Sequence, residues 1–265
     1  MIFLKQAKAF FSEAKRRNRL LFYLALALSF TFLIFLATFE VCGKPPLAEI
    51  CYWLKPFKFS LSFAAYVFTM GWLMEYLKPM IGEKRLRQAS LWIAALILIE
   101  MVVIFLQSIQ YSDSYAYLQL SEKSTQSISS VLHVMGNAGI LANTAVATYI
   151  AILFFGKIPL KPSSYLWGIR TGFAVFISSC FLGIFLLLYY GQVPPDHESF
   201  GFPFTQFYSA RSNLLSLHFF GIHAIQFFPL IGFYFKEQLA HFVICSLLFF
   251  YAGNIFFFLF QLIEL

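Results

Sequence analysis

The sequence predicts an all-α fold, a polytopic integral membrane bundle of seven transmembrane helices with the N-terminus inside and the C-terminus outside. Composition is the first reason: of 265 residues, 60% are hydrophobic and 12% are charged, and the mean hydropathy is +0.75. A soluble globule of this size needs far more polar surface. The second reason is a succession of apolar runs of about 20 residues, the length that crosses the hydrocarbon core of a membrane. The third is the uneven placement of Lys and Arg among the loops.

The first predicted domain is a cytoplasmic amphipathic and basic segment, residues 1–19. Six Lys and Arg residues alternate there with Phe, Ile and Leu, which is typical of a helix that lies in the membrane interface. Residues 20–265 form the second predicted domain, with seven transmembrane helices. Its first apolar run, residues 20–41, is too long for a signal peptide, and no small-residue cleavage site follows it.

The other six spans follow from apolar runs bounded by polar or turn residues. Pro56 is well placed at a helix N-terminus, so we expect the second span to begin there. The six ranges are residues 56–77, 90–110, 127–155, 166–190, 213–232 and 242–262. With the N-terminus inside, 14 of the 19 Lys and Arg residues fall in cytoplasmic segments and 5 outside, which favours this orientation. The net charge of +7 therefore reflects topology and indicates no nucleic-acid partner.

The sixth span is unusually polar for a membrane helix, because it contains His218, His223, Gln226 and Pro229. A polar side chain in hydrocarbon needs an internal partner, so this segment should face other helices or a cavity. In a straight helix His218 lies about 140° around the axis from His223, so the two rings cannot reach one small ligand. Pro229 removes the bond to the Ile225 carbonyl and is expected to kink the helix there.

Further polar residues lie in the second, third and fourth spans. Lys58, Gln107, His133 and His218 fall in the outer third of the membrane, and Glu100, Asn137, His223 and Gln226 lie nearer its middle. If these helices adjoin, they form one polar pocket that opens outward. An isolated carboxylate at the depth of Glu100 costs about 2.5–3.5 kcal/mol, so it should be protonated, paired or in contact with water.

Structural explanations compete with this hypothesis. Lys58 can snorkel to the interface, and His133 and Asn137, which share a helix face, can simply bind a neighbouring helix. Cys42 and Cys51 lie in the first outer loop, where a disulfide between them fits an oxidising exterior. Phosphate-loop, Rossmann and zinc-protease motifs do not occur in the sequence, so any chemistry rests on the intramembrane polar residues.

Four features resemble a group of bacterial multi-pass membrane proteins of uncharacterised function. They are W-L-K-P-F-K-F-S-L-S at residues 53–62, the spacing of Glu100 and Gln107, M-G-N-A-G at residues 135–139 and H-F-F-G-I-H-A-I-Q at residues 218–226. The resemblance extends over most of the chain. In that group an Arg-Gly pair and then Ser-His-Phe-Asn usually follow the glutamine of the third span. Here Gln110, Tyr111 and the stretch 114–117 stand in that region, so the histidine at the outer mouth is missing. The resemblance implies one polar site shared by several helices and no established reaction.

Three functions fit these residues. In the first, the protein has a redox role: His133 and one of His218 and His223 hold a haem b, or His133, one of His218 and His223, and Glu100 bind a transition metal near the outer face. In the second, the protein is a proton-coupled transporter of a small solute, in which Glu100 changes protonation and Lys58 attracts an anionic substrate. The third is a sensor or assembly factor without catalysis. In each case the expected location is the bacterial inner membrane, and the expected partners are the lipid bilayer and a small-molecule or cofactor ligand.

Overall fold

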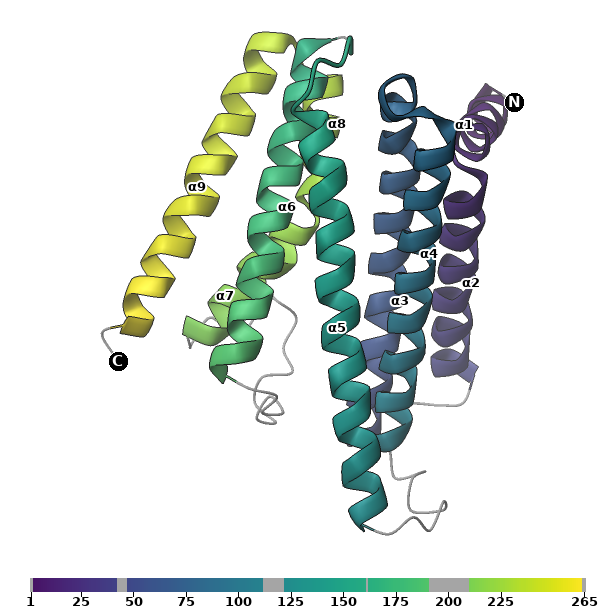
Figure 1. Cartoon of the computed structure of the whole chain (residues 1–265), viewed down its shortest axis with the longest axis vertical. Coiled ribbons are helices and arrows are strands. Elements are labelled where there is room, and N and C mark those ends of the chain that lie inside the picture. Colours follow the sequence, from purple (N-terminus) through teal and green to yellow (C-terminus); the bar gives the residue numbers. More distant parts are fainter. Residues whose placement is uncertain (1, 42–46, 112–121, 161, 191–209, 264–265) are drawn as a thin grey trace. The chain divides into compact units, whose positions relative to one another are not determined.

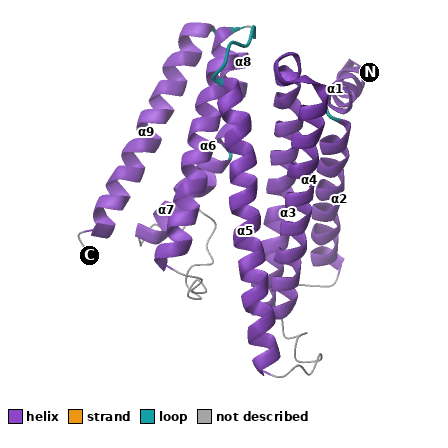
Figure 2. Ribbon diagram, viewed as in Figure 1, coloured by secondary structure: helices purple, strands orange, loops and turns teal. Residues whose placement is uncertain are grey.

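The computed structural model describes residues 2–41, 47–111, 122–160, 162–190 and 210–263, and every regular element among them is a helix (Figures 1 and 2). The chain divides into two compact units, residues 1–146 and 147–265. The predicted pair Cys42 and Cys51 lies outside this description, because Cys42 is not among the described residues.

Unit 1 contains five α-helices and a short 3₁₀ turn. These are α1 (Ile2–Arg17), α2 (Arg19–Val41), α3 (Leu47–Met74), the 3₁₀ helix η1 (Glu75–Leu77), α4 (Lys78–Tyr111) and most of α5 (Glu122–Phe154). Unit 2 contains the end of α5 and four helices, which are α6 (Ser163–Tyr190), α7 (Ala210–Ile222), α8 (Ala224–Tyr234) and α9 (Glu237–Ile263).

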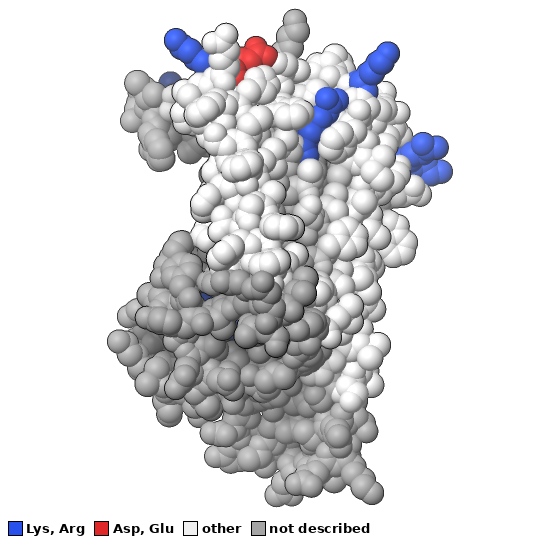
Figure 3. Space-filling view, turned by 90° about the vertical axis from the view of Figure 1, so that its left-hand side faces the viewer, with Lys and Arg blue, Asp and Glu red and all other residues white. Residues whose placement is uncertain are grey.

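Several helices are long and apolar enough to cross a membrane. Five candidate segments meet this test in the described residues, and a sixth results if the bent pair α7 and α8 counts as one. This confirms the all-helical membrane class that the composition predicts, whereas seven spans and their orientation stay predictions. On the face shown in Figure 3, most of the Lys and Arg side chains in view gather towards one end, and a broad uncharged surface lies beside them.

The core of unit 1 is formed by α2, α3 and α4, which pack along one another. Leu21, Val67, Met70 and Ile97 are buried in it. Helix α1 covers the end of α2 and α3, and it ends where Asn18 accepts a hydrogen bond from the backbone N–H of Leu21 at 3.1 Å. This is an N-cap, in which a side-chain oxygen satisfies one of the free N–H groups of the first turn of α2.

Two features of α3 and α4 differ from a simple pair of straight spans. Gly82 interrupts α4 with φ 77° and ψ 162°, a conformation that glycine adopts without steric cost. Pro56 was expected at a helix N-terminus, and this was wrong, because α3 begins at Leu47 and Pro56 lies inside it, although the candidate membrane segment starts at Lys55, next to Pro56. The apolar residues before Pro56 continue the helix, and a proline interior to a helix bends it more readily than it ends it.

In unit 2, α6 and α8 approach each other backbone to backbone. A β-carbon at Gly172 would lie 2.9 Å from the carbonyl oxygen of Ala224, and β-carbons at Gly168 and Gly232 would collide with the carbonyls of Phe228 and Ser164. Glycines along such a contact allow two membrane helices to pack without intervening side chains. Helix α9 packs against α6 and α8 through a cluster of buried residues, Val175, Ala224, Phe228 and Ile244. A second cluster, in which Leu214 of α7 meets Leu182 and Leu186 of α6, packs against Ile255 of α9.

Candidate functional site

Three polar side chains of unit 1 form a chain across α3, α4 and α5. The Lys55 ammonium donates to Gln107 Oε1 at 2.9 Å, and Gln107 Nε2 lies 3.3 Å from His133 Nδ1. Gln107 is buried, His133 is half-buried, and Lys55 as a whole residue is exposed. The structure therefore brings together two residues that the sequence placed at equal depth on separate helices, Gln107 and His133, and adds Lys55 to them.

The order of donors and acceptors in this chain is fixed by chemistry. The Lys55 ammonium can only donate, so the carbonyl oxygen of Gln107 must face it, and the Gln107 NH₂ group then faces His133. In a neutral His133 ring, Nδ1 accepts from that NH₂ group and the ring proton is on Nε2. A proton added at Nδ1 would set two donors against each other, so protonation of His133 is coupled to the orientation of the Gln107 amide.

Glu100 lies on α4 two helical turns before Gln107, on the same face of the helix. It is 6% exposed and forms no salt bridge or hydrogen bond with a described residue. A buried carboxyl group without a hydrogen-bond partner favours its protonated form in hydrocarbon. Glu100 thus adds a buried carboxyl group to the helix face that contains Gln107.

Two predicted members of the site lie apart from this chain. Lys58 is exposed, and the lysine that binds Gln107 is Lys55, one turn earlier on α3. Asn137 is half-buried and makes no hydrogen bond with another described residue. The second polar link between α3 and α5 is instead the Tyr66 hydroxyl, which donates to Asn143 Oδ1 at 3.2 Å.

In unit 2, His218 on α7 is paired with Ser179 on α6. The Ser179 hydroxyl donates to the His218 carbonyl at 2.6 Å, and His218 Nδ1 lies 2.7 Å from the Ser179 carbonyl, a distance at which Nδ1 is the donor. The imidazole lies against Gly183, where a β-carbon would be 2.8 Å from Nδ1. The proton on Nδ1 leaves Nε2 as the basic nitrogen of the neutral ring.

A tyrosine hydroxyl joins this pair. The Tyr251 hydroxyl of α9 and the Ser179 hydroxyl both lie over Gly221 of α7, where an added β-carbon would collide with the tyrosine oxygen and lie 2.6 Å from Ser179 Oγ. Tyr251 Oη is buried and has no hydrogen-bond partner among the described residues. The hydroxyl groups of Ser179 and Tyr251 therefore meet over a residue that has no side chain, and Ser179 links them to His218.

The polar sixth span is broken at His223, and its two halves differ in direction by 54°. His223 has φ −93° and ψ 0°, and its N–H donates to Phe220 rather than to the residue four positions earlier. The predicted kink at Pro229 and Ile225 was wrong in position. The bend lies six residues before Pro229, because α8 begins anew at Ala224 and accommodates the proline in its second turn.

His223 and Gln226 lie on either side of this break. The His223 ring makes an edge contact with Phe219, with ring centroids 4.9 Å apart. Both amide atoms of Gln226 are buried without a hydrogen-bond partner in the described structure. Broken membrane helices with free polar groups commonly line a binding site or a water-filled space.

The predicted site residues thus form two groups. Lys58, Glu100, Gln107, His133 and Asn137 belong to unit 1, and His218, His223 and Gln226 belong to unit 2. In the part of the chain that the structure describes, no three His, Cys, Asp or Glu side chains lie close enough to hold a metal ion.

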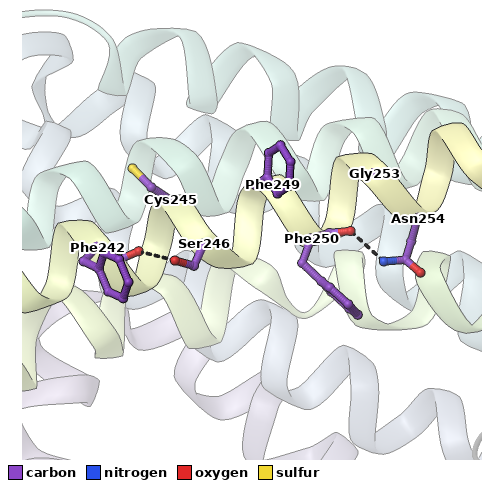
Figure 4. Close-up of a pocket in the computed structure, with 7 residues that line it drawn as sticks. All are labelled: Phe242, Cys245, Ser246, Phe249, Phe250, Gly253 and Asn254. Atoms are coloured by element: carbon purple, nitrogen blue, oxygen red, sulfur yellow. Dashed lines mark hydrogen bonds between the residues drawn. The ribbon is translucent and has the colours of Figure 1, made fainter.

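A shallow groove on α9 carries no such chemistry. Phe242, Phe249 and Phe250 line it with Cys245, Ser246, Gly253 and Asn254 (Figure 4). Its polar side chains bind their own helix: Ser246 Oγ donates to the Phe242 carbonyl at 2.9 Å, and Asn254 Nδ2 donates to the Phe250 carbonyl at 2.7 Å. An exposed, Phe-rich helix face with its polar groups satisfied is suited to contact with lipid chains.

Three residues at these sites were not predicted. Lys55 gives a signal in the sequence, since it stands one helical turn before Lys58, but the expected helix start at Pro56 placed it outside the span. Ser179 and Tyr251 give none, because single hydroxyl residues in apolar helices usually bind the backbone of their own helix.

Comparison with known proteins adds no relative to this description. No family model, curated protein or solved structure matches the chain, so the family resemblance stays a prediction and the site is defined by its own geometry.

Proposed function

We propose that the chain is a multi-pass protein of the bacterial inner membrane that binds a small polar solute and couples its binding to protonation. The site consists of Glu100, Gln107, His133 and Lys55. The observation that carries the proposal is the hydrogen-bonded chain from Lys55 through Gln107 to His133, next to a buried carboxyl group.

The hydrogen-bonded chain of Lys55, Gln107 and His133 supplies a physical mechanism that couples protonation to solute binding. When His133 is neutral, Gln107 presents its oxygen to Lys55 and engages the ammonium group. When His133 gains a proton at Nδ1, the Gln107 amide must turn its oxygen towards the imidazolium, and Lys55 loses its acceptor. The released ammonium then attracts an anionic group, either the Glu100 carboxylate or a solute, which links proton binding to solute binding.

The proton can be followed even though the solute is unknown. In infrared difference spectra of the purified protein, a pH step should change a carboxylic-acid C=O band in the wild type, and Glu100→Gln should remove that band. Glu83→Gln is the matched control, because Glu83 is an exposed carboxyl group on the same helix. The proposal fails if the band persists in Glu100→Gln or disappears in the control.

The solute step has its own test. In proteoliposomes that contain a pH-sensitive dye, an imposed membrane potential should drive a proton flux that rises when the transported solute is present. Glu100→Gln and Gln107→Leu should abolish this coupled flux, whereas Lys58→Arg should retain it. An equal flux in the wild type and in Glu100→Gln contradicts proton coupling at Glu100.

A cofactor role in unit 2 is the second candidate, and a specific observation favours it. Histidines that ligate haem iron or a transition metal usually donate their other ring N–H to a carbonyl, as His218 does to Ser179. His218 would then offer Nε2 as a ligand for haem b or a metal. Protein purified from its native membrane should show a Soret band or stoichiometric metal that His218→Ala removes, and a colourless, metal-free preparation contradicts this role.

Seven crossings with the N-terminus inside are the proposed topology. The candidate segment Lys55–Ile109 has 55 residues, about 80 Å of helix, and the hydrocarbon core is about 30 Å thick. Folding back at Gly82 divides it into two arms, so five segments become six, and the bent pair makes seven. The distribution of Lys and Arg supports the orientation. Cysteine labelling from each side of the membrane at exposed loop positions tests both.

A further inference from the structure

We infer that the junction of α1 and α2 binds the phosphate of an anionic phospholipid, through Lys15 and Arg19 beside the ring of Tyr23. Lys15 Nζ lies 5.4 Å from the centre of that ring, and the Arg19 guanidinium carbon lies 5.9 Å from it. The inference concerns the lipid boundary of unit 1 and is independent of the proton-coupled site.

The backbone places these residues in a row. The Asn18 N–H closes the last turn of α1 on the Ala14 carbonyl at 3.2 Å, and the Asn18 carbonyl accepts the first helical bond of α2 from the Phe22 N–H at 3.0 Å, so one residue separates the two helices. Phe11 and Lys15 are four residues apart on one face of α1, and Arg19 and Tyr23 are four residues apart on one face of α2. The contacts of Lys15 and Arg19 with the Tyr23 ring join these two faces into one ridge, which consists of Phe11, Lys15, Arg19 and Tyr23.

The ridge is exposed and lies at the height of lipid headgroups. Arg19 is the first residue of a candidate membrane span, and Phe11 and Tyr23 are 50% and 44% exposed. Exposed aromatic rings at this depth occupy the boundary between headgroups and acyl chains, and the cations between them reach the phosphates. The ridge therefore presents two positive charges between two interfacial rings.

The charges on the ridge have no acidic partner in the described part of the chain. The nearby carboxyl group, Glu13, binds Arg16 and Arg17 on another side of α1, with three hydrogen bonds of 2.8 Å. Arg17 is further held against Trp72, 4.2 Å from its ring centre. Lys15 and Arg19 form no salt bridge with a described residue, so two neighbouring cations repel each other unless an anion lies between them.

A phosphodiester fits this arrangement because it carries one negative charge and free oxygens that accept from both an ammonium and a guanidinium group. A lipid phosphate also keeps its acyl chains beside Phe11 and Tyr23, which a free phosphate cannot do. The ligand we assign is therefore an anionic phospholipid such as phosphatidylglycerol, recognised by charge at its phosphate and by apolar contact below it.

Native mass spectrometry of the full chain in a neutral detergent tests this assignment. Phosphatidylglycerol should bind more tightly than phosphatidylcholine with the same acyl chains, and Lys15→Gln with Arg19→Gln should weaken its binding roughly thirtyfold, since each charge near a headgroup contributes about a fivefold effect. The single Lys15→Gln variant should show about a fivefold loss. Circular dichroism of each variant verifies that the helices remain folded.

The matched control removes the same charge elsewhere on unit 1. Lys84 and Arg87 are exposed on α4, one turn apart, so Lys84→Gln with Arg87→Gln should leave binding close to that of the wild type. An equal loss in the control, or full binding by the Lys15 and Arg19 variant, overturns the assignment. Added phosphatidylglycerol should displace the bound lipid, and inorganic phosphate should not. If inorganic phosphate displaces the lipid equally well, the site binds free phosphate and the lipid assignment is wrong.

Discussion

His218 and Ser179 exchange hydrogen bonds across α6 and α7: the serine hydroxyl donates to the histidine carbonyl at 2.6 Å, and His218 Nδ1 lies 2.7 Å from the serine carbonyl. Each residue thus binds the other through both backbone and side chain. The pair fixes the rotation of α7 against α6, and it fixes the ring orientation of His218, on which any ligand function of Nε2 depends.

Ser179→Ala should lower the free energy of unfolding by about 0.6–1.7 kcal/mol, the range for hydrogen bonds between membrane helices. The loss arises because the His218 carbonyl and the Tyr251 hydroxyl both lie next to the deleted oxygen. Thermal unfolding in detergent measures it. Ser178→Ala is the control, since the Ser178 hydroxyl is exposed and donates to Ala174 within its own helix. Equal losses in the two variants would contradict a special role for Ser179.

Gly168→Ala should destabilise unit 2 by about 1–3 kcal/mol, because the new methyl group collides with the backbone carbonyl of Phe228, which cannot move without shifting α8. Gly253→Ala provides the comparison. A β-carbon there meets no atom within 4 Å, so that variant should be neutral or gain up to about 1 kcal/mol from better helix propensity. Denaturant or thermal unfolding distinguishes the two, and an unchanged midpoint for Gly168→Ala would falsify the close backbone contact.

The Glu13 carboxyl group should make the stability of the folded protein depend on pH. Hydrogen bonds from Arg16 and Arg17 lower the pKa of its carboxyl group from 4.5 to about 2. A lowered carboxyl pKa stabilises the folded state above the unfolded value, so the contribution should be complete above pH 4.5 and should be lost as the pH falls towards 2. The wild type and Glu13→Gln should therefore differ in melting temperature above pH 4.5 and converge below it. The difference should be small and decrease with salt, because the pair is solvent-accessible.

Asn18 has two separable roles at the start of α2. Its oxygen caps the Leu21 N–H, and its Nδ2 donates to Ser90 Oγ at 2.7 Å. Asn18→Ala should cost about 0.5–2 kcal/mol for the cap alone, and more with the lost bond to Ser90. Asn18→Asp keeps the cap and loses the donor, so its melting temperature should lie between those of the wild type and the alanine variant. A melting temperature for Asn18→Asp at or below that of Asn18→Ala would contradict this division.

The sequence predicts the helices well where hydropathy decides them. The first expected span, residues 20–41, matches α2 (Arg19–Val41), and the fifth, residues 166–190, lies within α6 (Ser163–Tyr190). An apolar run of this length has to form a helix in hydrocarbon, because a helix satisfies all the backbone N–H and C=O groups of the segment internally. The differences occur near the two prolines. Pro56, expected at the start of a helix, lies inside α3, and the bend expected at Pro229 lies at His223 instead, because packing can keep a proline within a membrane helix.

The candidate site could be predicted only in part. Glu100, Gln107 and His133 can be identified from the sequence, because polar and ionisable side chains inside a membrane are energetically costly and usually have a function. Their partners depend on how each helix is rotated about its axis relative to its neighbours, and hydropathy does not determine this rotation. That is why Lys55 rather than Lys58 reaches Gln107, and why the contact between Ser179 and His218, 39 residues apart, had no signal in the sequence.

The glycine contact between α6 and α8 has a mechanical consequence for unit 2. The backbones of these two helices are in direct contact, so a residue larger than glycine on α6 would have to push α8 away. Helix α7 leaves the direction of α8 at His223, and the Ser179 pair with His218 is its polar link to α6. We therefore expect that a ligand bound at His218 Nε2 would alter the packing of α7 more than that of α8.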